Sequence, residues 1–278
     1  MRDYAYYNGV FTPYDAAAIP LNDRSIFFAD AVYDVILGRN GKPYQIEEHL
    51  HRLFSNADAI GLEYFISENE LMHEAETLIK ESGHINFMLY VQMSAKGKRR
   101  THARQEIGAN ILMTVTAAEV PTELSSAHVI TLPDLRHGYC NIKTVSLLPS
   151  VFSVCDAQML GCECAIFNKD GVVTEASSSN VSILTDNVLI THPLDTSILP
   201  GISEKNLIAS AKKHGIHHER RKFTTDEMMR ADAVLLTSTT KLVKICRTID
   251  GVELECRGYD TASTFFADML SDVLVKTS

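Results

Sequence analysis

Five two-residue turn signals divide this sequence into short extended segments. Asn or Asp followed by Gly or Asn favours a turn in which both central residues take a positive φ, and such turns join two antiparallel strands directly. The signals are Asn8-Gly9, Asn40-Gly41, Asp170-Gly171, Asp186-Asn187 and Asp250-Gly251. Because they occur in both halves of the chain, they predict that β-hairpins shape the whole protein.

The N-terminal part combines helical and extended patterns. Apolar residues recur every three or four positions over residues 46–60, which predicts an amphipathic helix. Ser67 and Glu70 form a capping box, which predicts the start of a second helix. Extended segments follow on both sides of a basic loop, over residues 85–95 and 109–117. We therefore expect residues 1–118 to form a small α+β domain with an antiparallel sheet.

The C-terminal part is denser in short strands. Residues 119–126 show no regular apolar period and are expected to connect it to the N-terminal domain. Strands are predicted at residues 129–132, 163–168, 172–176, 181–184, 188–191, 216–222, 233–237, 242–249 and 252–255, and helices at 149–160, 203–214, 225–231 and 261–276. So many strands with few parallel crossovers predict a curved or barrel-like sheet flanked by helices, over residues 127–278.

Composition excludes several classes of protein. The 278 residues are 45% hydrophobic and 22% charged, and the net charge of −9 argues against a general nucleic-acid or anionic-membrane binder. No segment reaches the roughly 18 apolar residues of a membrane span, and the N-terminus lacks the pattern of a signal peptide. The six cysteines show no paired spacing and are expected to be buried free thiols, which favours a cytoplasmic protein.

The stretch Thr174-Glu175-Ala176-Ser177-Ser178-Ser179-Asn180 is unusual between two apolar strands. An acid followed by three hydroxyls and an amide is suited to a polar ligand. A Ser-rich turn explains the same residues, so both interpretations stay open at this point. On an extended chain, Ser178 would face away from its two neighbours.

Two further segments could bind an anion. Leu199-Pro200-Gly201-Ile202-Ser203 runs into a predicted helix start with Ser203 as its cap, where N–H groups and the helix dipole favour negative charge. Thr237-Ser238-Thr239-Thr240 presents hydroxyls at the end of an apolar strand. An ordinary capped helix and a polar strand end are the alternatives. Neither segment is a Walker loop or a G-x-G-x-x-G motif, which disfavours nucleotide binding by those routes.

Three cationic positions suggest chemistry. Lys143 lies in a largely apolar segment, and a desolvated amine can attack a carbonyl to form a Schiff base. Arg100 and His102 are two residues apart, so an extended backbone would direct both toward one carboxylate. Arg52 lies one step off the apolar stripe of its helix, where a solvated arginine is the usual case. An ordinary basic loop is the alternative for Arg100 and His102.

In combination, these segments resemble the fold-type IV pyridoxal-phosphate enzymes, and within them most closely the D-amino acid aminotransferases. The resemblance covers nearly the whole chain. Its anchors are residues 28–34 (FADAVYD), 48–53 (EHLHRL), 141–143 (NIK), 174–181 (TEASSSNV), 199–202 (LPGI) and 237–240 (TSTT). It implies a smaller N-terminal and a larger C-terminal domain with pyridoxal 5′-phosphate between them.

The resemblance also implies a role for each site residue. Lys143 would form the Schiff base and shuttle a proton, and Glu175 would pair with the pyridinium nitrogen so that the ring acts as an electron sink. The remaining cofactor contacts would come from Arg52, Ser178, Leu199, Ile202, Ser203, Ser238 and Thr239. Tyr33, Arg100 and His102 would bind the substrate carboxylate, with Arg100 and His102 supplied by the other subunit of a homodimer. No metal site is expected.

Some positions depart from the pattern of the family. Ala29, Ala31 and Ala176 stand where glycines are common, Asp34 replaces a customary Glu, and Thr101 stands where Asn is frequent. These changes narrow the site slightly and bear on substrate breadth more than on reaction class.

The resemblance implies transamination from a D-amino acid such as D-alanine to a 2-oxo acid such as 2-oxoglutarate. The alternatives are an aminodeoxychorismate lyase of the same fold, a transaminase for branched-chain L-amino acids or amines, and a non-enzymatic carrier of phosphate ligands. A lyase needs no amino acceptor, and a carrier has no need of Lys143, so both are distinguishable by experiment.

Overall fold

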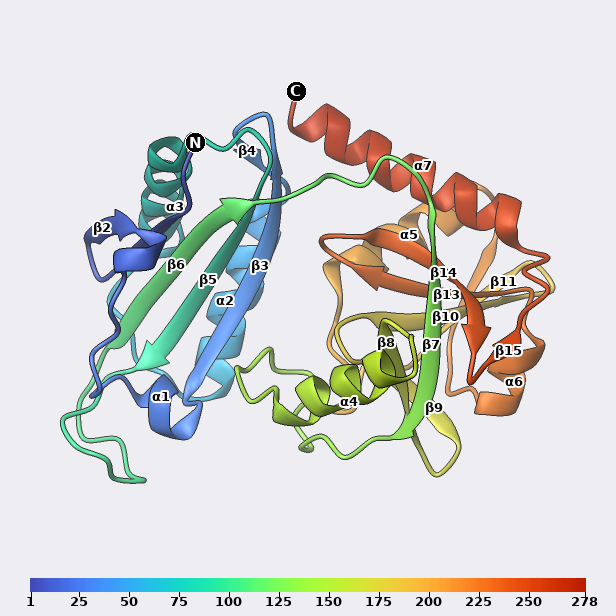
Figure 1. Ribbon diagram of the computed structural model, residues 1–278, viewed down its shortest axis with the longest axis horizontal. Helices are drawn as coiled ribbons and strands as arrows, with labels where there is room; N and C mark the ends of the chain where they lie inside the picture. Colours follow the sequence, from blue (N-terminus) through green and yellow to red (C-terminus); the bar gives the residue numbers. More distant parts are fainter. The chain divides into compact units, whose positions relative to one another are not determined.

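A computed structural model describes all residues from 1 to 278 (Figure 1). The chain forms two compact units. The first unit contains residues 1–120, 142–146 and 273–278, and the second contains residues 121–141 and 147–272. Each unit has its own sheet.

The first unit is built on a six-stranded antiparallel sheet with the order β2-β1-β6-β5-β3-β4. Asn8 and Gly9 form the turn of the first hairpin, and Asn40 and Gly41 form that of a second, all with positive φ, as predicted. The strands are β1 (Tyr4–Tyr7), β2 (Val10–Pro13), β3 (Ala31–Arg39), β4 (Lys42–Pro43), β5 (Phe87–Ala95) and β6 (Ala109–Ala117). The predicted α+β unit with an antiparallel sheet is confirmed.

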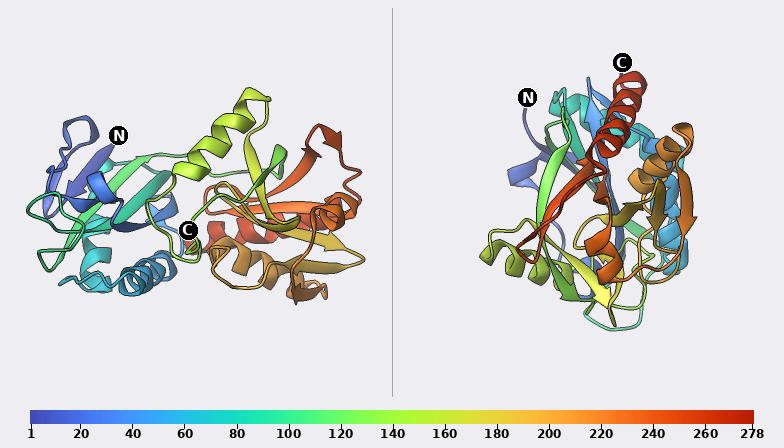
Figure 2. Two further views of the ribbon diagram at one scale, coloured as in Figure 1. Left: turned by 90° about the horizontal axis from the view of Figure 1, so that it is seen from below. Right: turned by 90° about the vertical axis from the view of Figure 1, so that its right-hand side faces the viewer.

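Two long helices, α2 (Ile46–Ala59) and α3 (Glu68–Ser82), cover one face of this sheet (Figure 2, left). The capping box of Ser67 and Glu70 is present at the start of α3. Core packing is tight, since a Cβ on Gly38 would lie 2.0 Å from the Phe87 ring. Two shorter elements were not predicted, the 3-10 helix η1 (Tyr14–Ala16) and the helix α1 (Arg24–Phe28).

Residues 142–146 pack with the first unit, although the predicted boundaries assign them to the C-terminal domain. The Tyr33 N–H donates to the Lys143 carbonyl at 2.9 Å, and Val32 forms a bridge with Thr144. The short strand β4 pairs only with the last residues of β3. The beginning of β3 therefore has an unpaired edge, and residues 142–146 lie along it. The last residues also join this unit, because Asn40 donates to the Thr277 carbonyl.

The second unit contains a nine-stranded sheet with the order β12-β11-β10-β13-β14-β7-β8-β9 and β15 beside β14. An additional pairing of β9 with β10 closes the strands from β10 to β9 into a ring. The strands are β7 (Ser125–Pro133), β8 (Cys164–Lys169), β9 (Val172–Ala176), β10 (Asn180–Thr185), β11 (Val188–Thr191), β12 (His217–Arg220), β13 (Ala233–Ser238), β14 (Leu242–Ile249) and β15 (Val252–Glu253). The predicted barrel-like sheet is confirmed.

Four helices accompany this barrel, namely α4 (Leu148–Met159), α5 (Ile202–Lys213), α6 (Thr225–Arg230) and α7 (Tyr259–Lys276). The predicted role of Ser203 as a helix cap is wrong. The N-cap of α5 is Gly201, whose extended backbone (φ −76°, ψ 132°) precedes a helix that already begins at Ile202. Ser203 therefore lies within the first turn.

All six cysteines are free thiols, as expected. Only Cys164, Cys246 and Cys256 are buried, because the other three lie in or beside α4 or in a loop near the surface. None of the helices combines the length and the apolar character needed to cross a membrane.

Candidate active site

In the second unit, three predicted site segments meet at Asn180. Asn180 lies opposite Glu175 at the pairing that closes the barrel, and opposite Thr237 in the neighbouring strand. Its Nδ2 donates to the Leu199 carbonyl at 2.7 Å, and the Leu199 N–H donates to Glu175 Oε2 at 2.9 Å. The sequence places Asn180 only among the polar residues after Glu175, whereas the structure makes it the residue that joins these segments.

Gly201 brings the start of α5 against the same asparagine. A Cβ at this position would lie only 2.0 Å from Asn180 Oδ1. Any side chain here would displace either Asn180 or the first turn of α5. The close approach thus fixes the helix start beside the residues that end β9 and β13.

The donors around this helix start suit a phosphate ester. The first N–H groups of a helix have no acceptor within the helix, and Gly201 offers no side-chain cap to Ile202 or Ser203. Thr237 is 2% exposed, and its Oγ1 has no hydrogen-bond partner. Ser238 and Thr239 follow at the end of β13 and are half-buried. A buried hydroxyl without a hydrogen-bond partner destabilises the protein unless a ligand supplies the partner. These donors therefore fit the phosphate of the expected cofactor.

Glu175 is 8% exposed and forms an ion pair with Arg136. Arg136 also donates through Nε to Asp134 Oδ1 at 2.9 Å, and its guanidinium lies 4.7 Å above the Phe167 ring. Burial opposes the charge on Arg136, but its hydrogen bond to Asp134 and the charges of Glu175 and Asp134 raise its pKa above the ordinary value. This pairing keeps Glu175 beside a permanent cation, and an ionised carboxylate is what a protonated ring nitrogen requires.

Arg136 was not identified from the sequence. It lies 39 residues before Glu175 in an irregular segment, and no local pattern links the two. The one available signal was the Asp134-x-Arg136 spacing next to a predicted strand end, which is common in surface loops.

The serines after Glu175 have distinct environments. Ser177 is buried, and its Oγ contacts Ser153 Oγ at 2.8 Å and the Ala165 N–H at 3.1 Å, so it attaches α4 to the barrel. The expected alternation does not apply, because the backbone bends here and the Ala176 N–H donates to the Ser179 carbonyl at 2.8 Å. Ser178 is exposed at the tip of this bend. Its assignment as a cofactor contact stays a prediction.

In the first unit, Lys143 lies beside Tyr33. The lysine Nζ is 4.6 Å from the centroid of the Tyr33 ring, which in turn stacks on Tyr90 at 5.4 Å. The backbone bond from Tyr33 to the Lys143 carbonyl fixes the two residues relative to each other. The predicted nucleophile and one predicted substrate contact are therefore neighbours.

Arg52 is not a solvated arginine, since 12% of its side chain is exposed. Its Nε and Nη2 each donate to a different oxygen of Asp34 at 2.8 Å, and His49 Nδ1 lies 2.8 Å from the same carboxylate. Burial opposes ionisation of Asp34, yet the charge of Arg52 and the bond from His49 hold its pKa below the ordinary value. The bidentate pair orients the guanidinium on α2.

Arg100 and His102 both contact Phe28 of α1. The Arg100 guanidinium lies 5.4 Å from the Phe28 ring centroid, and the His102 ring lies 5.4 Å from it. Both side chains are exposed on the loop between β5 and β6. Within one chain, Arg100 and His102 therefore contact α1 and not Tyr33.

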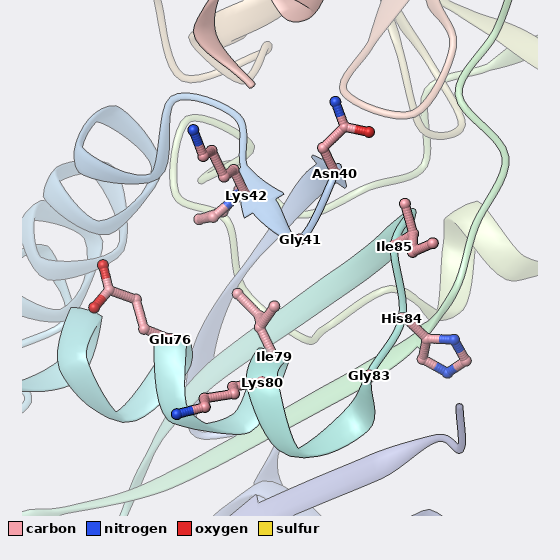
Figure 3. A pocket seen from close by; sticks show the side chains of 10 residues that line it. Asn40, Gly41, Lys42, Glu76, Ile79, Lys80, Gly83, His84 and Ile85 are labelled. Carbon is pink, nitrogen blue, oxygen red and sulfur yellow. The ribbon is translucent and has the colours of Figure 1, made fainter. Parts of the chain in front are cut away.

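A cavity of about 660 Å³ lies elsewhere in the first unit, at the turn between β3 and β4 and the C-terminal end of α3 (Figure 3). Its lining includes Asn40, Lys42, Lys80 and His84. None of the predicted site residues lines it, so it is separate from the candidate active site.

Comparison with known proteins agrees with this arrangement. The family described as "Amino-transferase class IV" matches residues 31–249. D-alanine aminotransferase from Bacillus licheniformis is 34% identical over 251 residues, which cover 88% of each chain.

Solved structures share the fold at lower identity. The branched-chain aminotransferase of Thermoproteus uzoniensis with norvaline has a TM-score of 0.87 at 20% identity and covers 97% of this chain and 95% of its own. A T.th. branched-chain amino acid aminotransferase with pyridoxamine 5′-phosphate has a TM-score of 0.85 at 18% identity, over 99% and 94% of the two chains. By the extent of these matches and by its two sheets, the chain belongs to the class IV aminotransferase family, whose cofactor is pyridoxal 5′-phosphate.

Proposed function

We propose that the protein transfers the amino group of a D-amino acid of the D-alanine type to a 2-oxo acid such as 2-oxoglutarate. The observation that carries the proposal is the convergence of Glu175, Leu199 and the start of α5 on Asn180. It provides an anionic acceptor for a ring nitrogen and a cluster of donors for a phosphate, as pyridoxal phosphate needs. The similarity to D-alanine aminotransferase supports the choice of substrate.

Each candidate residue then has a defined task. The bound cofactor supplies an electron sink for the charge that develops at the substrate Cα. Lys143 would take the proton from the substrate Cα on Nζ and deliver it to the cofactor, and would run the same transfer in reverse for the 2-oxo acid, with the Tyr33 ring limiting the positions of the amine. Glu175 would hold a proton at the pyridine nitrogen, and its ion pair with Arg136 would hold the carboxylate in place. Leu199 would pack on the ring.

Phosphate binding draws on neutral donors and one cation. We assign the N–H groups of Ile202 and Ser203 and the hydroxyls of Ser203, Ser238 and Thr239 to the phosphate oxygens, in keeping with the uncapped start of α5. Arg52 adds a positive charge whose orientation Asp34 sets. Ser178 completes the proposed cofactor contacts.

We assign the substrate carboxylate to Tyr33, Arg100 and His102, with Arg100 and His102 reaching the site of a second copy in a homodimer. Exposed apolar side chains on α4 support such an assembly, since Leu148 is 61%, Phe152 60% and Met159 85% exposed. The free cysteines support a reducing compartment such as the cytoplasm.

Incubation with D-alanine or L-alanine tests the reaction. We expect D-alanine alone to convert the visible spectrum to that of the pyridoxamine form, and 2-oxoglutarate to restore it. Lys143→Ala should abolish turnover and the visible band of the lysine-bound cofactor, whereas Lys169→Ala, an exposed lysine on β8, should preserve both. Turnover without an amino acceptor would indicate a lyase, and preference for L-alanine would contradict the assigned stereochemistry.

Hybrid dimers test the shared site. A mixture of Lys143→Ala and Arg100→Met chains, exchanged by mild denaturation, should regain activity, because one site of each hybrid receives both intact residues. No regain after demonstrated subunit exchange would place Arg100 outside the partner's site.

A further inference from the structure

We propose that Arg24 is a positioning residue for the substrate-carboxylate loop, which we define as residues 99–104. Together with Asp30 and Arg104 it holds the backbone that presents Arg100 and His102. This inference rests on the proposed function, in which those two side chains bind the substrate carboxylate. Figure 1 shows α1, which carries Arg24, next to the loop between β5 and β6.

The guanidinium of Arg24 donates hydrogen bonds to three successive carbonyls of this loop. Nη1 donates to the Thr101 carbonyl at 2.7 Å and to the Ala103 carbonyl at 3.4 Å, and Nη2 donates to the His102 carbonyl at 2.8 Å. The loop belongs to no helix or strand, so a sheet ladder does not hold these carbonyls. A single side chain therefore sets much of the backbone course on which Arg100 and His102 stand.

These hydrogen bonds are strong because Arg24 is buried and the charge of Asp30 compensates its own. Arg24 is 5% exposed, its Nε donates to Asp30 Oδ2 at 2.7 Å, and its guanidinium lies 4.6 Å from the Phe28 ring centroid. Burial opposes ionisation of Asp30, but hydrogen bonds from Arg104 and Arg24 hold its pKa below the ordinary value. Hydrogen bonds from a charged donor in such surroundings are stronger than those at the surface.

Arg104 holds the other end of the loop on the same carboxylate. Its Nε donates to Asp30 Oδ2 at 3.0 Å, and its Nη1 donates to the carbonyls of Ile60 and Gly61 at 3.0 and 2.6 Å. Asp30 thus binds two cations, Arg24 on α1 and Arg104 at the end of the loop. Arg100 and His102 lie between these two fixed points.

The base of the arrangement is anchored to the sheet. Asp23, which caps α1 and precedes Arg24, is 1% exposed and accepts hydrogen bonds from Tyr7 at 2.9 Å, Ser94 at 2.8 Å and Asn110 at 3.0 Å. These partners lie on β1, β5 and β6. Gly97 allows the chain to pass the Arg24 stem, since a Cβ there would lie 3.0 Å from Arg24 Cγ. The position of the loop is therefore transmitted from the core of the first unit.

Both substrates of the proposed reaction carry the carboxylate that this loop would bind. A misplaced loop should consequently raise KM for the amino acid and for the 2-oxo acid together. It should change kcat less, because Arg24 does not contact Lys143 or the reacting atoms. A residue of general structural importance would not give this paired effect.

Arg24→Met tests the inference, since it keeps an apolar stem and removes every donor. In the holoenzyme, hydrogen–deuterium exchange of peptides covering residues 99–104 should rise, and KM for D-alanine and 2-oxoglutarate should each rise about 10-fold or more, with kcat within about threefold. Arg24→Lys should recover only part of the loss, because an ammonium cannot span three carbonyls and Asp30 as a planar fork does.

Arg104→Met serves as a second variant if Arg24→Met fails to fold, because Arg104 is closer to the surface and holds the same carboxylate. Arg257→Met, at an arginine whose side chain is 60% exposed in the second unit, is the matched control and should change neither readout.

Unchanged exchange over residues 99–104 in a folded Arg24→Met or Arg104→Met protein would overturn the inference. So would an exchange increase spread evenly over the first unit, since Arg24 would then support the fold in general. If the wild-type protein failed to use D-amino acids, the proposed function would fall, while the exchange measurement would still decide whether Arg24 holds the loop.

Discussion

The two units present their candidate site residues in opposite ways. In the first unit two buried arginines are already paired with carboxylates, Arg52 with Asp34 and Arg24 with Asp30. In the second unit the anion-binding groups are backbone N–H groups at the start of α5 and hydroxyls such as Thr237 Oγ1, which has no partner. Paired groups contribute to the stability of the unliganded protein, whereas unpaired groups gain a partner only with a ligand.

The difference also follows from the two sheets. An open antiparallel sheet has one face for helices, and buried ion pairs such as Asp34 with Arg52 connect β3 to α2. A closed barrel fills its interior with side chains, so strand ends and the loops beside them are where polar groups can gather. Asn180 and Thr237 lie at such strand ends. Removing a buried acceptor such as Asp34 should therefore act mainly on stability, and removing a hydroxyl such as that of Thr237 mainly on cofactor binding.

The largest effect is expected for Asp34→Ala. Asp34 is fully buried, and its removal leaves Arg52 and His49 without their shared acceptor. The free energy of unfolding should fall by about 3–5 kcal/mol, as for other broken buried ion pairs. Urea denaturation at pH 7 measures it, with the exposed Asp15→Ala as control. A loss below about 1 kcal/mol would show that the pair does not stabilise the first unit.

The same pair predicts a pH dependence. The folded-state pKa of Asp34 lies below its ordinary value of 3.8, so the folded protein binds the proton less readily than the unfolded chain. The stabilisation is therefore complete above about pH 4 and is lost as the pH falls below it toward the lower folded pKa. The unfolding free energies of wild type and Asp34→Ala should converge in that acidic range and stay parallel from about pH 5 to 7.

Glu175→Gln should act on catalysis in the second unit. The substitution removes the negative charge that Arg136 compensates. The ring nitrogen would then hold its proton less strongly. We expect kcat to fall by about 10- to 100-fold, equivalent to one hydrogen bond to a charged group. Steady-state kinetics measure it, with Glu253→Gln, whose side chain is 70% exposed, as control. An unchanged kcat would remove Glu175 from the proposed cofactor site.

Gly201→Ala should have an intermediate effect. The added methyl group would meet Asn180 Oδ1, so either Asn180 or the start of α5 must move. We expect a loss of about 1–3 kcal/mol in stability and a weaker hold on pyridoxal phosphate. Thermal unfolding and cofactor titration test both, with Gly138→Ala, where a Cβ meets nothing within 4 Å, as the matched control. Equal behaviour of the two variants would refute the close approach.

The smallest effect is expected for Thr237→Val. Replacing a buried hydroxyl without a partner by a methyl group should change the stability of the cofactor-free protein by less than about 1 kcal/mol, in either direction. Cofactor affinity should nevertheless fall severalfold if the hydroxyl donates a hydrogen bond to the phosphate. This substitution thus separates stability from ligand binding, and an unchanged affinity would show that the hydroxyl does not serve the ligand.

Local patterns predicted much of the fold. Asn8-Gly9 and Asn40-Gly41 predict their hairpins because asparagine and glycine adopt a positive φ readily, without the help of distant contacts. Capping boxes at Ser67 and Thr224 likewise mark their helices through contacts three residues apart. The helix α1 was missed because five residues are too few to show a helical period, and the contacts of Asp23 and Arg24 are with distant segments.

The resemblance to a family assigns roles to Lys143 and Glu175, and these roles stay predictions. Roles for Arg136 and Asn180 were not predictable, since their importance depends on which strands become neighbours. Ser203 shows a smaller failure of the same kind. Its hydroxyl made it a plausible cap, but the space left by Gly201 lets the helix begin one residue earlier.

The closure of the barrel also has a consequence for the order of events during synthesis. β9 and β10 are close in sequence, but the ring between them requires β14, which pairs in parallel with β7 across about 120 residues. Until Leu242–Ile249 has left the ribosome, Glu175 and Thr237 have no closed framework between them. Long-range parallel pairing is slow to form, so we expect the barrel to close late, after most of the chain has been translated.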